Sequence, residues 1–126
     1  MVSIVLIGTN HRGLIVFDKN TRTGKQIALP AGMGANYDAT AIEIDPAGNL
    51  IWVFVQQRGL FVFNLSTKKL SLLNSDIKEG NCLRRASDGN LWLGNERGLF
   101  EYNNQRNQYS ANRITTTSKI VLSYLL

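Results

Sequence analysis

Short stretches in which apolar and polar residues alternate recur along the whole chain. Three of them share one pattern, in which Arg-Gly-Leu is followed by alternating residues and closed by Asp or Asn. These stretches are His11–Asp18, Gln57–Asn64 and Glu96–Asn103. A period of two residues is typical of a β-strand, and no stretch of about ten residues shows the 3.6-residue period of a helix. The pattern therefore predicts an all-β chain with internal repeats.

Each Arg-Gly-Leu stretch is preceded by a second strand-sized apolar stretch, and turn sequences separate the repeats. The preceding stretches are Val5 to Gly8, Leu50 to Val55 and Leu91 to Gly94. Further candidate strands cover residues 41–44, 70–73 and 82–85. The repeated glycines Gly13, Gly59 and Gly98 lie 46 and 39 residues apart, close to the roughly 40–50 residues of one propeller blade. We therefore expect a partial β-propeller of about three antiparallel blades, each with about four strands.

Alternation within the strands predicts which side chains pack between blades, because both faces of a blade are covered. One set is expected to face one neighbouring blade: Leu14, Val16, Leu60, Val62 and Leu99. The other set is expected to face the opposite neighbour: Ile15, Phe17, Phe61, Phe63, Phe100 and Tyr102. Trp52 and Trp92 occupy equivalent repeat positions and are expected to pack between blades rather than to stack on a sugar. Cys82 is expected to act as a small apolar residue of an inner strand.

The repeats divide the chain into an incomplete first blade at residues 1–37, a second blade at 38–78 and a third at 79–112. Residues 113–126 then contain one more candidate strand, Lys119 to Tyr124. The first blade lacks its inner strand, and this last strand has the right character to replace it. About three blades are too few for a closed ring, which typically has four to eight. We expect the chain to be part of a larger propeller, or to form a homodimer in which each last strand completes the partner's first blade.

Composition narrows the classes of function. The 126 residues are enough for one domain, and the net charge of +5 is spread over the chain. No apolar run is long enough to span a membrane, and no signal peptide is recognisable. Cys82 and His11 are the only residues of their types, which excludes an intrachain disulfide, a Cys/His zinc site and most nucleophilic triads. We expect no metal, no cofactor and no nucleic-acid partner.

The third repeat, Asp88 to Asn103, resembles the two-component regulator propeller repeat, whose pattern runs roughly D-x-x-G-x-L-W-I-G-T-x-x-G-L-x-x-Y-D. The first repeat keeps the second half of this pattern from Leu6 to Asp18. The second repeat has two extra residues between Leu50 and Gly59, which we interpret as a longer hairpin.

This resemblance implies a non-catalytic, ligand-sensing module. Proteins with this repeat are commonly the extracytoplasmic parts of hybrid two-component histidine kinases that respond to glycans. It implies signal transduction, an oligosaccharide or small-molecule ligand and a periplasmic location, with membrane attachment through a segment that this chain lacks. Two alternatives stay open: a propeller enzyme of the lyase or lactonase type, and a scaffold that docks another protein.

Three arginines are the candidate ligand-binding residues. Arg12, Arg58 and Arg97 each precede the glycine of a repeat, so a propeller places them in equivalent hairpins on one face. Guanidinium groups in a partial ring would bind an acidic sugar or another anion. The alternative is a solvated arginine that stacks over its own hairpin in each blade.

Overall fold

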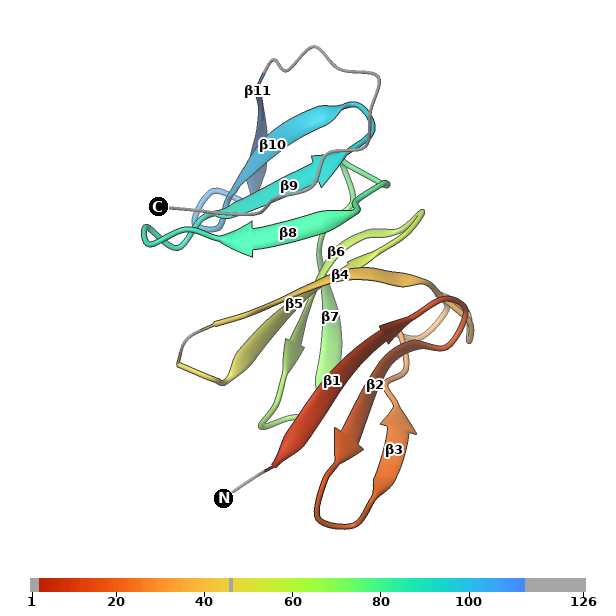
Figure 1. The fold of residues 1–126 in the computed structure, drawn as a ribbon. Coiled ribbons are helices and arrows are strands. Elements are labelled where there is room, and N and C mark those ends of the chain that lie inside the picture. The colour runs from red at the N-terminus through yellow and green to blue at the C-terminus, as the bar shows by residue number, and fades with distance from the viewer. Residues whose placement is uncertain (1–2, 46, 113–126) are drawn as a thin grey trace.

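Antiparallel strands in three separate sheets make up the fold (Figure 1). The structure is a computed structural model that describes residues 3–45 and 47–112. The first sheet contains β1 (Ile4–Thr9), β2 (Gly13–Asp18) and β3 (Thr23–Gln26). The second contains β4 (Ala39–Ile44), β5 (Leu50–Val55), β6 (Gly59–Asn64) and β7 (Lys69–Asn74). The third contains β8 (Cys82–Arg85), β9 (Leu91–Asn95), β10 (Gly98–Asn103) and β11 (Gln108–Asn112). The described ranges contain no helix, which confirms the all-β prediction.

The sheets follow one another as blades of a propeller do. Strands within each sheet are neighbours in chain order, and β4 contacts both β1 and β8 in the adjacent sheets. Figure 1 shows the first sheet in red and orange, the second in yellow and green and the third in cyan and blue. The predicted arrangement of antiparallel blades in a partial propeller is therefore confirmed.

The first sheet has three strands where the other two have four. Its β1–β2 hairpin carries the same Arg-Gly-Leu sequence as the β5–β6 and β9–β10 hairpins, so β1 corresponds to β5 and β9. The described residues therefore supply no counterpart of β4 and β8 in this sheet. The candidate strand Lys119 to Tyr124 lies outside the described residues.

The Asp or Asn that closes each repeat forms the same turn in all three sheets. The Oδ1 atom of Asp18 accepts hydrogen bonds from the backbone N–H groups two and three residues later, and so do those of Asn64 and Asn103. In each turn the fourth residue after it has a positive φ, at Arg22, Lys68 and Asn107. Short Asx side chains satisfy the backbone of tight turns in this way, so the repeated residue is structural.

Two apolar clusters separate the three sheets. The first lies between sheets one and two and includes Leu14, Ile51, Val53 and Phe61. The second lies between sheets two and three and is composed mainly of Trp52, Phe54, Leu60, Leu83, Leu91, Leu93 and Tyr102. Strand β5 alternates between the two clusters, which explains why Leu50 to Val55 is apolar without interruption. Each fully buried large side chain contributes about 1.5–3 kcal/mol to stability.

The predicted orientation of the β2, β6 and β10 side chains is confirmed where a cluster covers them. Leu14 and Val16 pack toward the second sheet, and Leu60 and Val62 pack toward the third. On the opposite faces, Phe61 and Phe63 pack toward the first sheet, while Phe100 and Tyr102 pack toward the second. The two extra residues of the second repeat lengthen its hairpin, as predicted, since one extends β5 and one extends the turn.

The two tryptophans differ in their surroundings, although they occupy the same repeat position. Trp52 is 3% exposed and lies in the cluster between sheets two and three, as predicted. Trp92 is half-buried on the face of the third sheet that is turned away from the second. Its register neighbours there are Arg84 and Glu101. The prediction that Trp92 packs between blades stays a prediction, because the described residues contain no sheet beyond the third that could cover this face.

Candidate functional site

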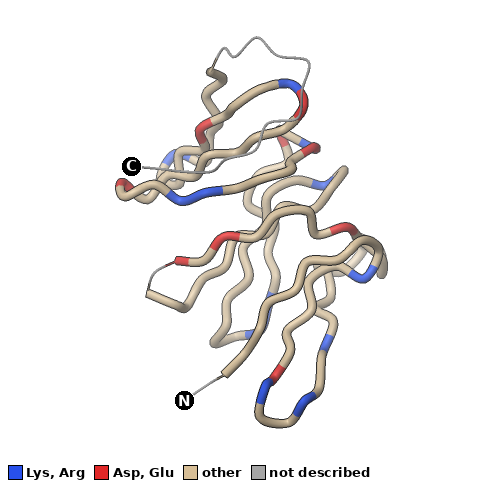
Figure 2. Tube along the Cα trace, in the orientation of Figure 1, with Lys and Arg blue, Asp and Glu red and all other residues tan. Residues whose placement is uncertain are grey.

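The three arginine hairpins lie along one edge of the molecule, at the right in Figure 1. Arg12 is in the β1–β2 turn, Arg58 in the β5–β6 turn and Arg97 in the β9–β10 turn. The two connections between sheets, residues 27–38 and 75–81, reach the same edge. We call these three turns and two connections the hairpin rim. Figure 2 shows that Lys and Arg are also spread over other turns, so the charge is not confined to the rim.

The first connection is hydrogen-bonded to the hairpins on both of its sides. The Tyr37 N–H donates to the His11 carbonyl at 3.0 Å, and the Gln56 N–H donates to the Asp38 carbonyl at 3.0 Å. The Asp38 carboxylate also accepts the His11 N–H at 2.6 Å. Adjacent backbone segments bonded in this way hold the first two hairpins in a defined relation.

The second connection joins the second and third hairpins in the same manner. The Gln57 N–H donates to the Lys78 carbonyl at 2.7 Å. The buried side chain of Asn95 donates through Nδ2 to the Glu79 carbonyl at 2.8 Å, while its Oδ1 accepts the N–H groups of Arg97 and Gly98. A satisfied buried amide of this kind fixes its neighbours, so the Arg97 turn is held in place before any ligand arrives.

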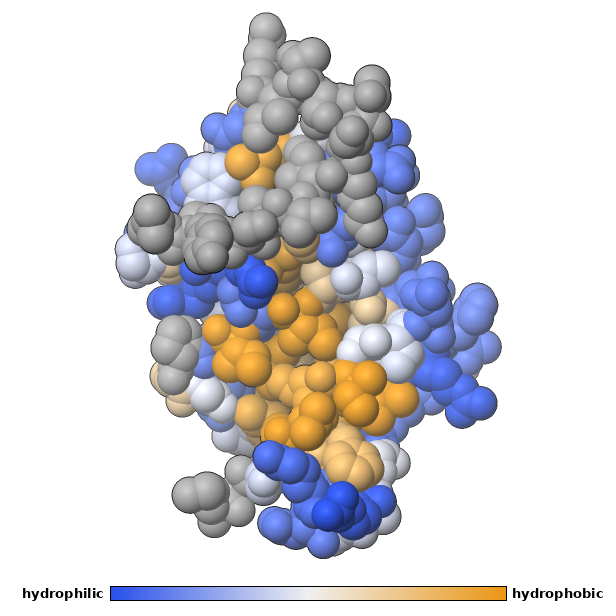
Figure 3. Space-filling view, in the orientation of Figure 1, coloured by the Kyte–Doolittle hydropathy of each residue, from blue (hydrophilic) through white to orange (hydrophobic). Residues whose placement is uncertain are grey.

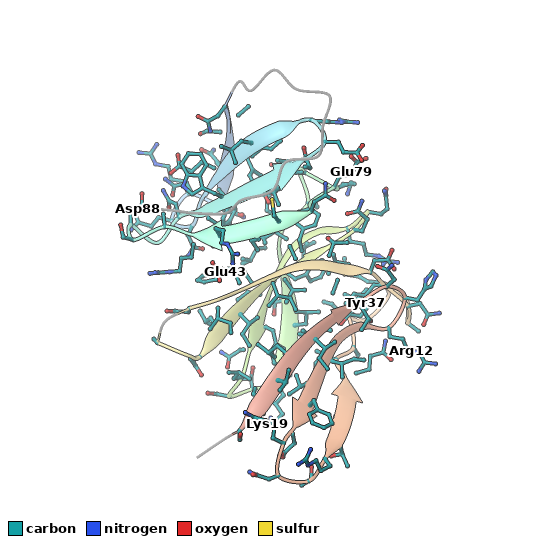
Figure 4. All side chains as sticks on the ribbon, in the orientation of Figure 1. Arg12, Lys19, Tyr37, Glu43, Glu79 and Asp88 are labelled. Carbon is teal, nitrogen blue, oxygen red and sulfur yellow. The ribbon has the colours of Figure 1, made fainter. Side chains whose placement is uncertain are left out.

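The three arginine side chains have different surroundings. Arg12 is exposed and points away from the sheets in Figure 4. Arg58 is half-buried and packs against the first connection, at Gly34. One of its guanidinium nitrogens lies 3.3 Å from the position that a Cβ atom on Gly34 would occupy. Arg97 is exposed and lines a pocket. A shared anion site formed by all three arginines stays a prediction, and the geometry favours Arg97 among them.

The pocket at Arg97, which we call the rim pocket, has a volume of about 410 Å³. It is lined by Asp76, Ile77, Lys78, Glu79, Asn95, Arg97 and Phe100. Ile77 and Phe100 belong to the edge of the cluster between sheets two and three, and they supply apolar surface. Charged groups of both signs surround this surface, and Figure 4 labels Glu79 at this edge. Apolar surface beside hydrogen-bonding groups suits a ligand with an apolar ring face and many hydroxyls.

Sequence reasoning identified Arg97 but missed the other walls of this pocket. Asp76, Lys78 and Glu79 carry no repeat signal in the sequence. All three lie in the second connection, whose path depends on how two sheets pack. No local pattern encodes that path.

Tyr102 and Tyr109 pack at the cluster between sheets two and three, and both stay protonated. Tyr109 has a buried hydroxyl without a hydrogen-bond partner among the described residues. Burial raises the pKa of Tyr109 well above its ordinary value, and nearby Tyr102 and Asp76 raise it further. Burial likewise raises the pKa of Tyr102, whose hydroxyl lies 2.7 Å from Asn107 Oδ1. Deprotonation is therefore unfavourable here, and these tyrosines do not offer a general base.

Three further features of residues 3–45 and 47–112 bear on reaction chemistry. No group of three His, Cys, Asp or Glu side chains there is arranged to hold a metal ion. His11 and Asp38 form a pair with Nδ1 and Oδ1 3.8 Å apart, and the His11 side chain is 88% exposed. Cys82 is half-buried on inner strand β8, with Sγ 3.7 Å from the Gly94 carbonyl. Within the described residues there is no helix long and apolar enough to cross a membrane.

Comparison with known proteins finds similarity at the level of structure. No family model and no curated protein matches the chain. Two solved structures described as extracellular domains of hybrid two component systems from B. thetaiotaomicron align with TM-scores of 0.74. One is 20% identical over 87% of this chain, and the other is 19% identical over 92%. A structure described as the extracellular domain of a one component system from this organism aligns with a TM-score of 0.71 and 20% identity over 87% of this chain.

In every case the alignment covers 16% of the solved chain, so this chain spans about one sixth of the length of the structures that it matches. Identity near 20% shows the fold alone. The structural neighbours are of the class that the repeat resemblance indicated. The chain therefore has the fold of a segment of these extracellular domains.

Proposed function

We propose that the chain is a non-catalytic, ligand-sensing propeller module that responds to a glycan. The observation that carries this proposal is the rim pocket, where apolar surface from Phe100 and Ile77 lies beside Lys78, Glu79 and Arg97. An oligosaccharide presents C–H faces and hydroxyls together, which matches such a lining. The fold similarity to extracellular sensor domains supports the assignment, as well as a periplasmic or extracellular location and a role in two-component signalling.

Arg97→Ala is expected to weaken oligosaccharide binding about 10-fold or more, because it removes a charge-assisted hydrogen-bond donor from the rim pocket. A glycan array selects the tightest oligosaccharide, and isothermal titration calorimetry then compares affinities. Arg106→Ala is the matched control, since Arg106 is an exposed arginine in the β10–β11 turn. Equal affinity of both variants for the selected glycan would remove the rim pocket from the proposal. A chain that binds nothing on the array would favour the docking-scaffold alternative.

The ring is completed, in our proposal, by further blades from a longer polypeptide or from a second copy of the chain. Val5, Ile7, Ile15 and Phe17 share the face of the first sheet that is turned away from the second. Val5 and Ile7 are 41% and 38% exposed, and Ile44 on β4 is 47% exposed. Figure 3 shows apolar side chains gathered over this part of the molecule. Apolar surface of this kind is normally covered in a finished fold.

A solution mass distinguishes the two ways of completing the ring. If a second copy completes it, light scattering of the 14.0 kDa chain should give twice that mass, and deletion of residues 118–126 should abolish the dimer. A soluble monomer with cooperative unfolding would exclude the dimer. A loosely folded monomer that binds its missing blades in trans would instead support the longer polypeptide.

A further inference from the structure

One edge of the first sheet is open. Strand β1 pairs with β2 along one side, and no described strand pairs with its other side. The equivalent strands β5 and β9 each hold an inner strand there, namely β4 and β8. Strand β1 contains no charged residue and no proline that would discourage pairing. We call this side the open edge of β1.

The backbone groups at the open edge follow from the register of β1 on β2. The Lys19 N–H donates to the Ser3 carbonyl at 2.9 Å, so Ser3 and Lys19 form a hydrogen-bonded pair. Such pairs alternate along an antiparallel ladder, and the backbone groups of Ile4, Leu6 and Gly8 therefore point away from β2. A row of N–H and C=O groups along a strand edge is a template for another strand.

Exposed apolar side chains border the open edge. Val5 and Ile7 lie on β1, and Ile44 lies on β4, on the face turned toward the first sheet. These are three of the four large apolar residues that are exposed among the described residues. Figure 3 shows apolar surface over this part of the molecule. Such surface is normally covered, so the open edge suits a strand that packs on β1 and β4 together.

Strands β4 and β8 show which side chains suit such an edge. In the same register, both run through a compact, an apolar and a polar residue: Ala41-Ile42-Glu43 and Cys82-Leu83-Arg84. The polar position of β4 reaches the next inner strand, since Glu43 Oε2 accepts the Arg85 N–H at 2.8 Å. The counterparts on β1 that would face such a strand are Gly8, Ile7 and Leu6, counted back from the glycine of the repeat.

A later segment of the chain has this pattern and the spacing of an inner strand. Val121-Leu122-Ser123 again runs compact, apolar, polar, and it lies outside the described residues. Val121 follows Tyr109 by 12 residues, and Cys82 follows Leu70 by 12 residues. Tyr109 and Leu70 hold the same register position in β11 and β7. The repeat therefore predicts that Val121 corresponds to Cys82.

We propose that the open edge of β1 binds residues 121–124 of a second copy as an antiparallel strand, with Leu122 opposite Ile7 and Ser123 opposite Leu6. This assignment rests on the proposed completion of the ring by a second copy, and it specifies the partner segment and its register. In this register Leu122 extends the apolar face of β1 that carries Ile7. Ser123 lies on the opposite face, which is turned toward β4.

A second copy suits this position because the docked strand arrives attached to its own third sheet. The outward face of that sheet carries Trp92, and the outward face of the first sheet carries Val5, Ile7, Ile15 and Phe17. Docking of the strand brings these two faces together. Exchange in both directions gives a closed two-fold assembly, in which the open edge and both outward faces are buried.

Cysteine cross-linking of the full chain tests this register. The background is Cys82→Ala, which replaces the native thiol by the residue found at the equivalent position of β4. Chains with Ile7→Cys and chains with Leu122→Cys are co-expressed with different tags and oxidised mildly. The backbone of Ile7 is bonded to β2, so Ile7 and Leu122 form a non-hydrogen-bonded pair, whose Cα separation of about 4.5 Å permits a disulfide. We expect a disulfide-linked heterodimer as the main product.

Val121→Cys and Ser123→Cys are the matched controls for Leu122→Cys. A shift of one residue along a strand moves the side chain to the opposite face of the sheet. Each control, paired with Ile7→Cys, should therefore give at least about 10-fold less heterodimer. Circular dichroism checks that every variant keeps the β-sheet fold.

Three results would overturn the proposal. Equal cross-linking at residues 121, 122 and 123 would mean random collision rather than a docked strand. Absence of the heterodimer with Leu122→Cys would mean that this segment does not occupy the open edge. A disulfide within one chain that carries both Ile7→Cys and Leu122→Cys would show that the same copy closes the edge. No ligand takes part in this test and light scattering reports the dimer separately, so a wrong register is distinguishable from a failed dimer and from a failed glycan assignment.

Discussion

Gly13→Ala is expected to lower the free energy of unfolding by more than about 3 kcal/mol. A Cβ at this position would stand 2.0 Å from the Tyr37 ring, far inside van der Waals contact. The ring has little room to move, because Tyr37 is 3% exposed and its hydroxyl bonds the Leu14 N–H and the Ile27 carbonyl. Any displacement would leave those buried backbone groups unpaired, which adds a further cost.

The backbone of Gly13 contributes separately, since its φ is +63°. Gly32→Ala is the matched control, because Gly32 has a φ of +85° and a Cβ there would meet no atom within 4 Å. We expect the control to lose about 1 kcal/mol, from the left-handed conformation alone. Urea denaturation followed by tryptophan fluorescence measures both variants. Similar losses in the two would mean that Tyr37 yields to the new methyl group and that the steric argument is wrong.

Trp52→Ala is expected to cost about 3–5 kcal/mol, the range for truncating a large buried aromatic side chain. Trp52 lies between the second and third sheets, where Phe54, Leu60 and Leu93 are fully buried around it. Removing it would open a cavity that neighbours held by two sheets cannot fill. The unfolding transition should therefore shift strongly in urea.

Trp92→Ala provides the comparison at the same repeat position. Trp92 is half-buried, with Arg84 and Glu101 beside it in the register, so we expect a loss of about 1 kcal/mol in the monomeric chain. Addition of the remaining blades, from a longer polypeptide or a second copy, should raise this cost toward that of Trp52. An equal cost for both tryptophans in the monomer would show that something already covers this face of the third sheet.

Much of the strand architecture was predictable because it depends on neighbours along the chain. The alternation in β2 and β6 predicted correctly that Leu14 and Leu60 face one way and Phe61 the other. The residues that close the repeats, such as Asp18 and Asn64, also act locally, through side-chain bonds to backbone groups two and three residues later. Such contacts are encoded within a few residues of sequence and recur wherever that sequence recurs.

The candidate sites were less predictable, because their walls come from segments that meet across sheets. Arg97 could be selected from its repeat position, but Asp76 and Lys78 join it through the connection between two sheets. Ile7 lies 37 residues before Ile44, and these two side chains border one open edge only because β1 and β4 contact each other across adjacent sheets. Likewise, identical repeat positions gave Trp52 a buried environment and Trp92 a half-buried one.

The sequence by itself determined the all-β class, the repeated hairpins and the face of each strand that is apolar, since hydrophobic period and turn chemistry act over a few residues. The tertiary structure decided which faces are covered, how the rim is bonded together and where charges gather into a pocket. Those features depend on the stacking of successive sheets, which brings residues that are distant in sequence within a few ångströms of each other. No local pattern carries that information, because it arises when one apolar face buries another.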